Sequence, residues 1–311
     1  MRFEGIYPPI ITPFRDDLTI NWEAWAEVVE FLIAEGVHGI IVGGTTGEFY
    51  AMSDEERVEQ LRRGKDIIAG RLPLIAGVNA LNAAACVDMA VAAKDAGADA
   101  LLLAAPPYSL PGQAELAAHC LKVQAATGLP VMLYNYPGRT GVDMERPFLD
   151  IVVTNPAICA IKDASGDIDR VHMIAREYPS LQLSIGAEDL ALEFFAWGAR
   201  SWVSPIPNFL PKPVVKLYEA CALEGDYDKG RRLMDALLPI STFLERSGSY
   251  MQCVKHGCEH LGLKAGAVRP PLLPMDETIK TDLSAALDKA TADVERILAE
   301  AAGPKQAAAV S

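Results

Sequence analysis

One lysine stands at the end of an apolar run, where a charged side chain is unexpected. The run Ile158–Ile161 is followed directly by Lys162. If this run is a strand buried on both faces, side-chain alternation directs Lys162 toward the interior or the mouth of the sheet. Burial lowers the pKa of an amine and frees its lone pair for attack on a ketone. We interpret Lys162 as the nucleophile of a Schiff-base reaction. An ordinary ion pair with Asp163 or Glu188 is the alternative, and position alone does not decide between the two.

Three further groups close or follow apolar runs and suit the same chemistry. Tyr134 ends the preceding run, and a phenol there can pass protons to and from a carbinolamine. The turn Gly44–Gly47 holds two threonine hydroxyls and backbone N–H groups that a carboxylate can approach closely. Arg139 follows in a Pro-Gly turn and can hold a second carboxylate through two hydrogen bonds. Each group alone also has an ordinary reading: a packed tyrosine, a simple glycine-rich turn and a surface arginine.

Signatures of other chemistries are missing from the sequence. His256-x-x-x-His260 lacks the glutamate of a zinc protease motif, and the six scattered cysteines form no Cys-x-x-Cys pair. No Gly-x-Ser-x-Gly elbow and no Walker loop occurs. The sequence therefore predicts no metal site. A lysine imine also acts as its own electrophilic centre, so no organic cofactor is expected.

Short apolar runs alternate with longer segments of helical period, the pattern of a (β/α)8 barrel with a parallel sheet. The predicted strands are Ile6–Thr12, Gly39–Gly43, Leu74–Val78, Ala100–Ala104, Val131–Tyr134, Ile158–Ile161, Leu181–Ile185 and Ser201–Ser204. The predicted helices between them are Trp22–Ala34, Asp54–Ile68, Ala84–Ala96, Ala114–Ala126, Ile168–Glu177, Leu190–Trp197 and Val214–Leu223. An open doubly wound sheet is disfavoured, because no Gly-x-Gly-x-x-Gly follows the first strand. Barrel active sites lie at the carboxyl ends of the strands, where the four groups above are found.

The barrel is predicted to occupy residues 1–223. Three further helices, Tyr227–Arg246, Tyr250–Leu261 and Glu277–Ala302, form a predicted C-terminal extension over residues 224–302. The small and polar residues 303–311 are predicted to be a disordered tail.

The composition is globular and acidic, with 50% hydrophobic residues and a formal net charge of −13 in 311 residues. An acidic chain repels phosphate backbones and anionic lipid, which argues against nucleic acid and membrane partners. The N-terminus lacks a basic start before an apolar core, so no signal peptide is expected. Scattered cysteines fit a reducing compartment, and the predicted location is cytoplasmic.

Three strings, taken together and in this order, resemble the dihydrodipicolinate synthase / N-acetylneuraminate lyase family. They are Gly44-Thr45-Thr46-Gly47-Glu48, Tyr134-Asn135-x-Pro137-x-Arg139-Thr140-Gly141 and Ile161-Lys162-Asp163-Ala164-Ser165-Gly166-Asp167. The resemblance runs from about Gly5 to Pro274. It implies a barrel with a C-terminal helical extension, pyruvate and a small aldehyde as substrates, and a homotetramer or homodimer.

The same resemblance implies roles for four residues in catalysis. Lys162 matches the lysine that condenses with pyruvate, and Tyr134 matches the tyrosine that relays protons and helps to hold the keto acid. Thr45 matches the threonine of the proton relay. Tyr108 matches the tyrosine that members insert into the site of a neighbouring subunit, so the resemblance implies that oligomerisation is part of catalysis.

Four more residues match substrate-binding positions of the family. Thr46 matches a group that binds the pyruvate carboxylate, and the backbone at Gly186 and Val203 matches positions that line the pocket. Arg139 matches the arginine that holds the carboxylate of aspartate semialdehyde, which favours the condensation of lysine biosynthesis. A keto-deoxy sugar acid aldolase or dehydratase using the same imine is the alternative, and a non-catalytic keto-acid binder is a third reading. The chain departs from the family at Gly248–Met251, where an Asn-Pro pair is usual.

Overall fold

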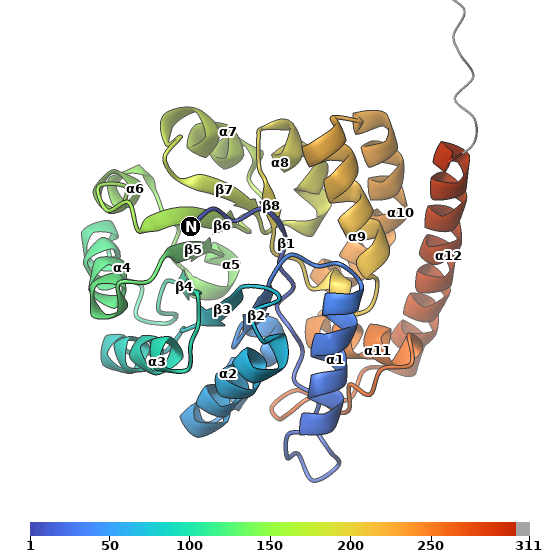
Figure 1. Cartoon of the computed structure of the whole chain (residues 1–311), viewed down its shortest axis with the longest axis horizontal. Helices are drawn as coiled ribbons and strands as arrows, with labels where there is room; N and C mark the ends of the chain where they lie inside the picture. The colour runs from blue at the N-terminus through green and yellow to red at the C-terminus, as the bar shows by residue number, and fades with distance from the viewer. Residues whose placement is uncertain (303–311) are drawn as a thin grey trace, which may run out of the picture.

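Eight parallel strands curl around the centre of the molecule, and helices surround them (Figure 1). The computed structural model describes residues 1–302. The strands follow one another around the sheet, and the first pairs with the last. They are β1 (Gly5–Ile6), β2 (Ile40–Val42), β3 (Leu74–Gly77), β4 (Ala100–Ala104), β5 (Val131–Asn135), β6 (Ile158–Asp163), β7 (Gln182–Ile185) and β8 (Ser201–Trp202). The predicted (β/α)8 barrel is confirmed.

The segment after β1 closes the barrel against β2 through isolated contacts. Pro9 forms a parallel bridge with Ile41. The Ile41 N–H donates to the Pro8 carbonyl at 3.0 Å, and the Ile10 N–H donates to the Ile41 carbonyl at 2.9 Å. The predicted strand Ile6–Thr12 was wrong in extent, because Pro8 and Pro9 have no N–H to continue a regular ladder.

Nine α-helices follow the strands in the described part of the barrel. They are α1 (Trp22–Ala34), α2 (Asp54–Ile68), α3 (Ala83–Asp95), α4 (Gln113–Thr127), α5 (Pro137–Thr140), α6 (Arg146–Val152), α7 (Ile168–Glu177), α8 (Ala191–Ala196) and α9 (Pro211–Tyr218). The helices α5 and α6 were not predicted, and the other seven lie close to their predicted positions. At the start of α2, the Glu56 N–H donates to Ser53 Oγ at 3.2 Å and the Ser53 N–H donates to Glu56 Oε2 at 3.0 Å. This reciprocal pair is a capping box, which satisfies two free donors of the first helical turn.

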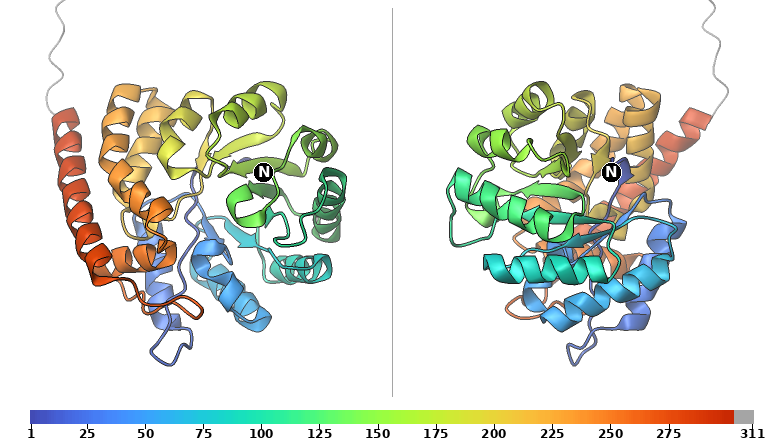
Figure 2. Two further views of the ribbon diagram at one scale, coloured as in Figure 1. Left: turned by 180° about the vertical axis from the view of Figure 1, so that it is seen from behind. Right: turned by 60° about the vertical axis from the view of Figure 1, so that its left-hand side comes forward.

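Three helices follow the barrel and pack together on one side of it (Figure 2). They are α10 (Tyr227–Arg246), α11 (Tyr250–His260) and α12 (Glu277–Ala302). The helix α10 also packs against α8 and α9. The division into residues 1–223 and 224–302 stays a prediction, and the predicted tail 303–311 lies outside the described residues.

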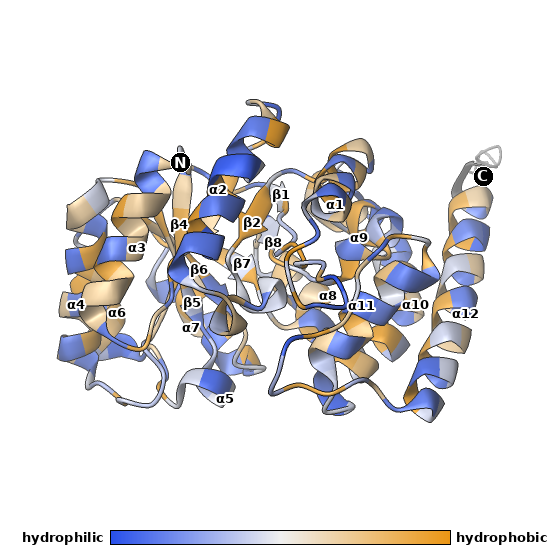
Figure 3. Cartoon of the chain, turned by 90° about the horizontal axis from the view of Figure 1, so that it is seen from below, coloured by the Kyte–Doolittle hydropathy of each residue, from blue (hydrophilic) through white to orange (hydrophobic). Residues whose placement is uncertain are grey.

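Side-chain alternation along the strands separates two layers of apolar packing. One cluster fills the inside of the barrel, and a larger one lies between the strands and the helices. Figure 3 shows apolar residues on strands such as β2 and β4 and hydrophilic residues on the helices. Inside the barrel, Met132 and Ala160 are fully buried in the inner cluster. Tyr134 and Lys162 follow them by two residues and therefore point the same way. Within residues 1–302, no helix combines the length and the apolar character that a membrane crossing requires.

Candidate active site

Lys162 lies on β6 directly beside Tyr134 of β5, since the two residues are register partners. The lysine side chain is 7% exposed, and its Nζ atom lies 4.1 Å from the centroid of the Tyr134 ring. Burial lowers the pKa of the Lys162 amine, while the negative charge of Glu188 acts in the opposite direction. The geometry therefore favours an amine that can lose its proton near neutral pH and attack a carbonyl carbon.

The carboxylate next to Lys162 in the sequence is used elsewhere. Asp163 Oδ2 accepts hydrogen bonds from Arg170 Nε at 3.0 Å and from Asn135 Nδ2 at 2.9 Å. These contacts turn Asp163 toward α7 and away from the cavity. Within residues 1–302, no carboxylate forms an ion pair with Lys162 at 4.0 Å or less. The ion-pair reading with Asp163 is therefore wrong, and Glu188 acts on the lysine only over a longer distance.

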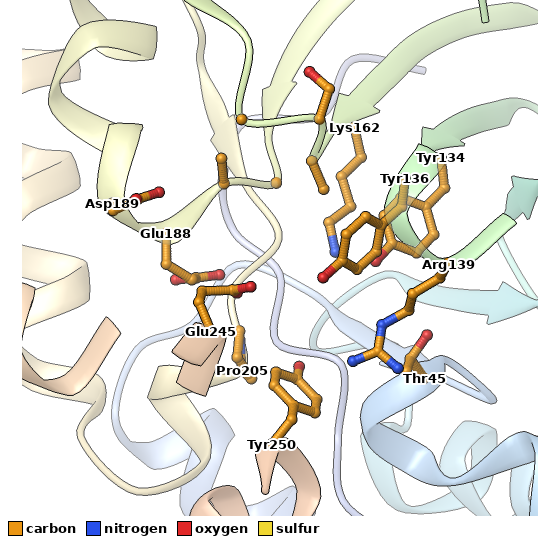
Figure 4. A pocket seen from close by; sticks show the side chains of 15 residues that line it. Thr45, Tyr134, Tyr136, Arg139, Lys162, Glu188, Asp189, Pro205, Glu245 and Tyr250 are labelled. Atoms are coloured by element: carbon orange, nitrogen blue, oxygen red, sulfur yellow. The ribbon is translucent and has the colours of Figure 1, made fainter. Parts of the chain in front are cut away.

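Two glutamates face the cavity opposite the lysine, as Figure 4 shows. Glu188 follows β7 and is 3% exposed, and its Oε2 atom accepts a hydrogen bond from Ser204 Oγ at 2.7 Å. Burial raises the pKa of Glu188 and that of Glu245, which lies near the end of α10. The two carboxyl groups thus favour their protonated forms more than exposed glutamates do. Together they can exchange protons or bind hydroxyl groups.

Two tyrosines line the same cavity: Tyr134 lies in β5, and Tyr136 directly follows that strand. The ring centroids of Tyr134 and Tyr136 are 5.9 Å apart. Burial raises the pKa of Tyr134 well above its ordinary value, so its phenol keeps its proton at neutral pH. A neutral phenol beside an amine can donate its proton to a developing alkoxide and take one back.

The glycine-rich turn after β2 brings its two threonines to the barrel mouth. Gly43 has a φ of +76°, and a side chain there would lie 2.9 Å from the Gly77 carbonyl oxygen. Only glycine accepts this combination without strain. Thr45 lines the cavity, and Thr46 Oγ1 lies 2.9 Å from the hydroxyl of Tyr250.

Arg139 lies in the short helix α5 at the rim of the cavity. Its guanidinium lies 5.4 Å from the centroid of the Tyr136 ring and 5.3 Å from that of the Tyr250 ring. Stacking between two rings orients the planar guanidinium and leaves its N–H groups for a ligand.

These side chains enclose a cavity of about 220 Å³ at the carboxyl ends of the strands. Its lining consists of Thr45, Tyr134, Tyr136, Arg139, Lys162, Ala164, Ser165, Gly166, Gly186, Ala187, Glu188, Asp189, Pro205, Glu245 and Tyr250. Within the described residues, no group of three or more His, Cys, Asp or Glu side chains has the arrangement of a metal site.

The structure brings together most, but not all, of the residues predicted from the sequence. Gly186 lines the cavity, and a side chain on it would lie 2.8 Å from Lys162 Cγ, so the glycine makes room for the lysine stem. Val203 is fully buried in the inner barrel cluster, and Pro205 lines the cavity in its place. Tyr108 is 94% exposed, with a φ of +75°, and it does not line the cavity of its own chain.

Ten of the fifteen lining residues were not predicted as site residues, and Tyr136, Glu245 and Tyr250 are the three of them that come from outside the expected strand ends or bring a phenol. Tyr136 lies inside the second of the three quoted strings, and its place beside Tyr134 was the available signal. Glu245 and Tyr250 come from helices that follow the barrel, so no strand position indicates them. The departure at Gly248–Met251 was the only sequence signal for Tyr250.

The chain that forms this cavity is similar to members of a known protein family. The model of the Dihydrodipicolinate synthetase family matches residues 2–290. A 4-hydroxy-tetrahydrodipicolinate synthase from an Exiguobacterium species is 35% identical over 288 residues, covering 92% of this chain and 98% of that protein.

Solved structures agree with these sequence matches. The 4-hydroxy-tetrahydrodipicolinate synthase of Methylacidiphilum fumariolicum SolV superposes with a TM-score of 0.91 at 31% identity, covering 96% of this chain and 99% of that chain. A prophage protein of the dihydrodipicolinic acid synthase family from E. coli K12, solved in complex with pyruvate, gives 0.88 at 28% identity, covering 94% and 99%.

Proposed function

Because the chain belongs to the dihydrodipicolinate synthetase family of Schiff-base lyases, we propose that Lys162 is the amine that condenses with pyruvate. One observation carries this proposal. The Lys162 amine is buried at the cavity floor, 4.1 Å from the Tyr134 ring centroid, without an ion-pair partner among the described residues. A buried amine in such surroundings is destabilised as a cation and is therefore activated as a nucleophile.

The proposed reaction begins when neutral Lys162 Nζ attacks the keto carbon of pyruvate. The carbonyl oxygen takes a proton from Tyr134, and a second protonation releases that oxygen as water to give the imine. The Thr45 hydroxyl takes part in this proton relay. The backbone N–H groups of the turn at Thr46 hold the pyruvate carboxylate. Loss of a methyl proton from the protonated imine then gives an enamine.

In the second half-reaction the enamine carbon forms a bond to the aldehyde carbon of the other substrate, and the aldehyde oxygen takes up a proton. Hydrolysis of the resulting imine releases an open-chain keto acid and restores Lys162; where the aldehyde carried an amino group, that amine then condenses with the keto carbon and loses water to close the ring. We propose aspartate semialdehyde as the aldehyde, with its carboxylate on Arg139, which makes the protein a 4-hydroxy-tetrahydrodipicolinate synthase. The stacked and oriented guanidinium of Arg139 and the names of the relatives support this choice.

A keto-deoxy sugar acid aldolase or dehydratase remains the second candidate. The observation that favours it is the pair Glu188 and Glu245 on the wall opposite Arg139. Carboxyl groups accept hydrogen bonds from sugar hydroxyls, which aspartate semialdehyde lacks. The ammonium group of aspartate semialdehyde can donate hydrogen bonds to the same two glutamates. The wall is therefore compatible with both substrates.

The assembly is proposed to be a homotetramer or a homodimer in which Tyr108 enters the site of a neighbouring subunit. Its 94% exposure and its absence from the cavity of its own chain support this role. We further propose that the enzyme works in the cytoplasm, where its six free cysteines stay reduced.

Borohydride reduction in the presence of pyruvate tests the proposed function. A stable adduct is expected on the peptide that contains Lys162, and the buried Lys255 serves as an internal control that stays unmodified. An adduct on another lysine, or none, overturns the proposal. Assays with aspartate semialdehyde and with sugar aldehydes then separate the two candidate reactions. Pyruvate binding without exchange of its methyl protons would instead identify a non-catalytic binder.

A further inference from the structure

The helix α11 delivers a phenol to the cavity from outside the barrel. Tyr250 is its first residue, and Figure 4 shows the side chain rising toward the same space as Arg139 and Thr45. The Tyr250 hydroxyl lies 2.9 Å from Thr46 Oγ1, and the Arg139 guanidinium lies 5.3 Å from the centroid of its ring. The phenol therefore lies between the threonine turn and the arginine.

A second contact fixes the same helix to the same turn. Lys255 lies five residues after Tyr250, and its Nζ atom is 2.7 Å from Glu48 Oε1. The two side chains are 3% and 0% exposed. Lys255 Nζ also donates to the Ala267 carbonyl at 2.5 Å. Since Thr46 and Glu48 belong to one turn, α11 is held against that turn at two points.

We propose that Tyr250 is a substrate-binding residue whose phenol donates a hydrogen bond to the carboxylate of the aldehyde substrate, alongside the guanidinium of Arg139. A carboxylate has lone pairs for both N–H groups of a guanidinium and for one further donor. In this arrangement Thr46 donates its own hydroxyl proton to the Tyr250 oxygen, which leaves the phenol proton for the ligand. The inference rests on the proposed function and adds a second donor to the carboxylate that Arg139 is proposed to hold.

The protonation state of the phenol agrees with a donor role. Burial raises the pKa of Tyr250, so the group keeps its proton across the physiological range. The residue also lies where the chain departs from the Asn-Pro pair usual in the family. The phenol at this position brings one hydroxyl donor into the cavity.

The test uses the full-length enzyme with its pyruvate position filled. Borohydride reduction first fixes pyruvate on Lys162, and the adduct is then titrated calorimetrically with succinic semialdehyde, which carries a carboxylate, and with butanal, which does not. Tyr250→Phe should weaken succinic semialdehyde binding about tenfold, the usual loss for one hydrogen bond to a charged group. Butanal binding should not change. Arg139→Ala should show the same selectivity, and Tyr227→Phe, on a partly exposed tyrosine of α10, is the matched control without effect.

Equal affinities of Tyr250→Phe and wild type for succinic semialdehyde overturn the inference, as does a wild-type adduct that does not bind this ligand. A Tyr250→Phe enzyme that loses tenfold in the rate of pyruvate trapping, with unchanged aldehyde binding, also overturns it, because the phenol then serves the pyruvate carboxylate. If no adduct forms on Lys162 in wild-type enzyme, the proposed function has failed as well. A well-formed adduct with unchanged affinities contradicts only the role of Tyr250.

Discussion

Two lysines are buried among the described residues, and they differ in what each one contacts. Lys162 is 7% exposed and has the Tyr134 ring beside its nitrogen, while Lys255 is 3% exposed and has Glu48 at 2.7 Å. Burial lowers the pKa of both amines, and a nearby glutamate opposes that shift in each case. Only Lys255 is in direct contact with its glutamate and with a backbone carbonyl.

This difference supports a reactive role for Lys162 and a structural role for Lys255. A buried charge is tolerated when a partner and hydrogen bonds replace the water it has lost. Lys255 has both, and it ties α11 to the turn after β2. Lys162 has neither among the described residues, so its neutral form is favoured and its lone pair is available. Burial alone therefore does not distinguish the two lysines, whereas the lack of a direct partner among the described residues supports the role proposed for Lys162.

The largest expected effect is that of Lys162→Met. We expect turnover to fall by about four orders of magnitude, because no other group can form the imine. The free energy of unfolding should stay equal or rise at pH 7, since the substitution removes an amine whose charged form is disfavoured by burial. Steady-state kinetics and urea denaturation measure the two effects. A variant that is inactive because it is unfolded would contradict the comparison.

Lys255→Met should give the opposite pattern. Removing one partner leaves the buried Glu48 uncompensated, so the free energy of unfolding should fall by about 3 kcal/mol. Pyruvate trapping on Lys162 should persist at temperatures where the variant is folded. Urea denaturation provides the measurement, with Lys289→Met as the control, because Lys289 is 77% exposed. Equal stabilities of the two variants would show that the Glu48 pair contributes nothing.

Arg139→Ala tests whether the cavity divides into two substrate positions. We expect the KM for aspartate semialdehyde to rise about tenfold to a hundredfold, because the variant loses the contact with the carboxylate of this second substrate. The rate of pyruvate trapping should stay within about twofold of the wild-type rate. Arg146→Ala is the matched control, because Arg146 pairs with Glu177 on the surface. A parallel loss of both activities would mean that Arg139 does not discriminate between the substrates.

The pH dependence of trapping reports the state of Lys162. Because burial lowers its pKa, the trapping rate should rise with pH and reach its midpoint below the value of about 10.4 that a free lysine has. The same shift makes the unfolded chain bind more protons between the two pKa values. The contribution of Lys162 to stability therefore increases as pH rises through that window. A midpoint at or above the value of free lysine would indicate a solvated or ion-paired amine.

The smallest effect is expected for Glu188→Gln. The negative charge of Glu188 raises the pKa of Lys162 against the effect of burial. Its removal should move the trapping profile to lower pH by less than about one unit. The measurement is the trapping rate across pH. Glu193→Gln, on α8, is the control. A shift to higher pH would require a different electrostatic role for Glu188.

Most of the fold could be predicted from local patterns. The helices α1, α2, α7 and α10 begin and end at the predicted residues, because each combines a clear apolar period with a capping or glycine signal. The first strand was predicted too long, since its backbone extends through two prolines that cannot donate. The helix α6 was missed because it has only seven residues, one of them proline.

Only the site residues that lie on strands or directly after them could be predicted from the sequence. Tyr134 and Lys162 follow from the alternation of side chains along β5 and β6, which sends both into the barrel. Tyr250 and Glu245 reach the cavity through the packing of α10 and α11 against the barrel. Such contacts between distant segments leave no periodic signal in the sequence. The difference between Lys162 and Lys255 likewise depends on Glu48, which lies more than two hundred residues from its partner.

A crystal structure of the enzyme soaked with pyruvate tests the central claim most directly. We predict a covalent bond between Lys162 Nζ and the keto carbon, with the carboxylate against Thr46 and the Tyr134 hydroxyl next to the new imine. Pyruvate bound without a bond to this nitrogen, or joined to a different lysine, would contradict it.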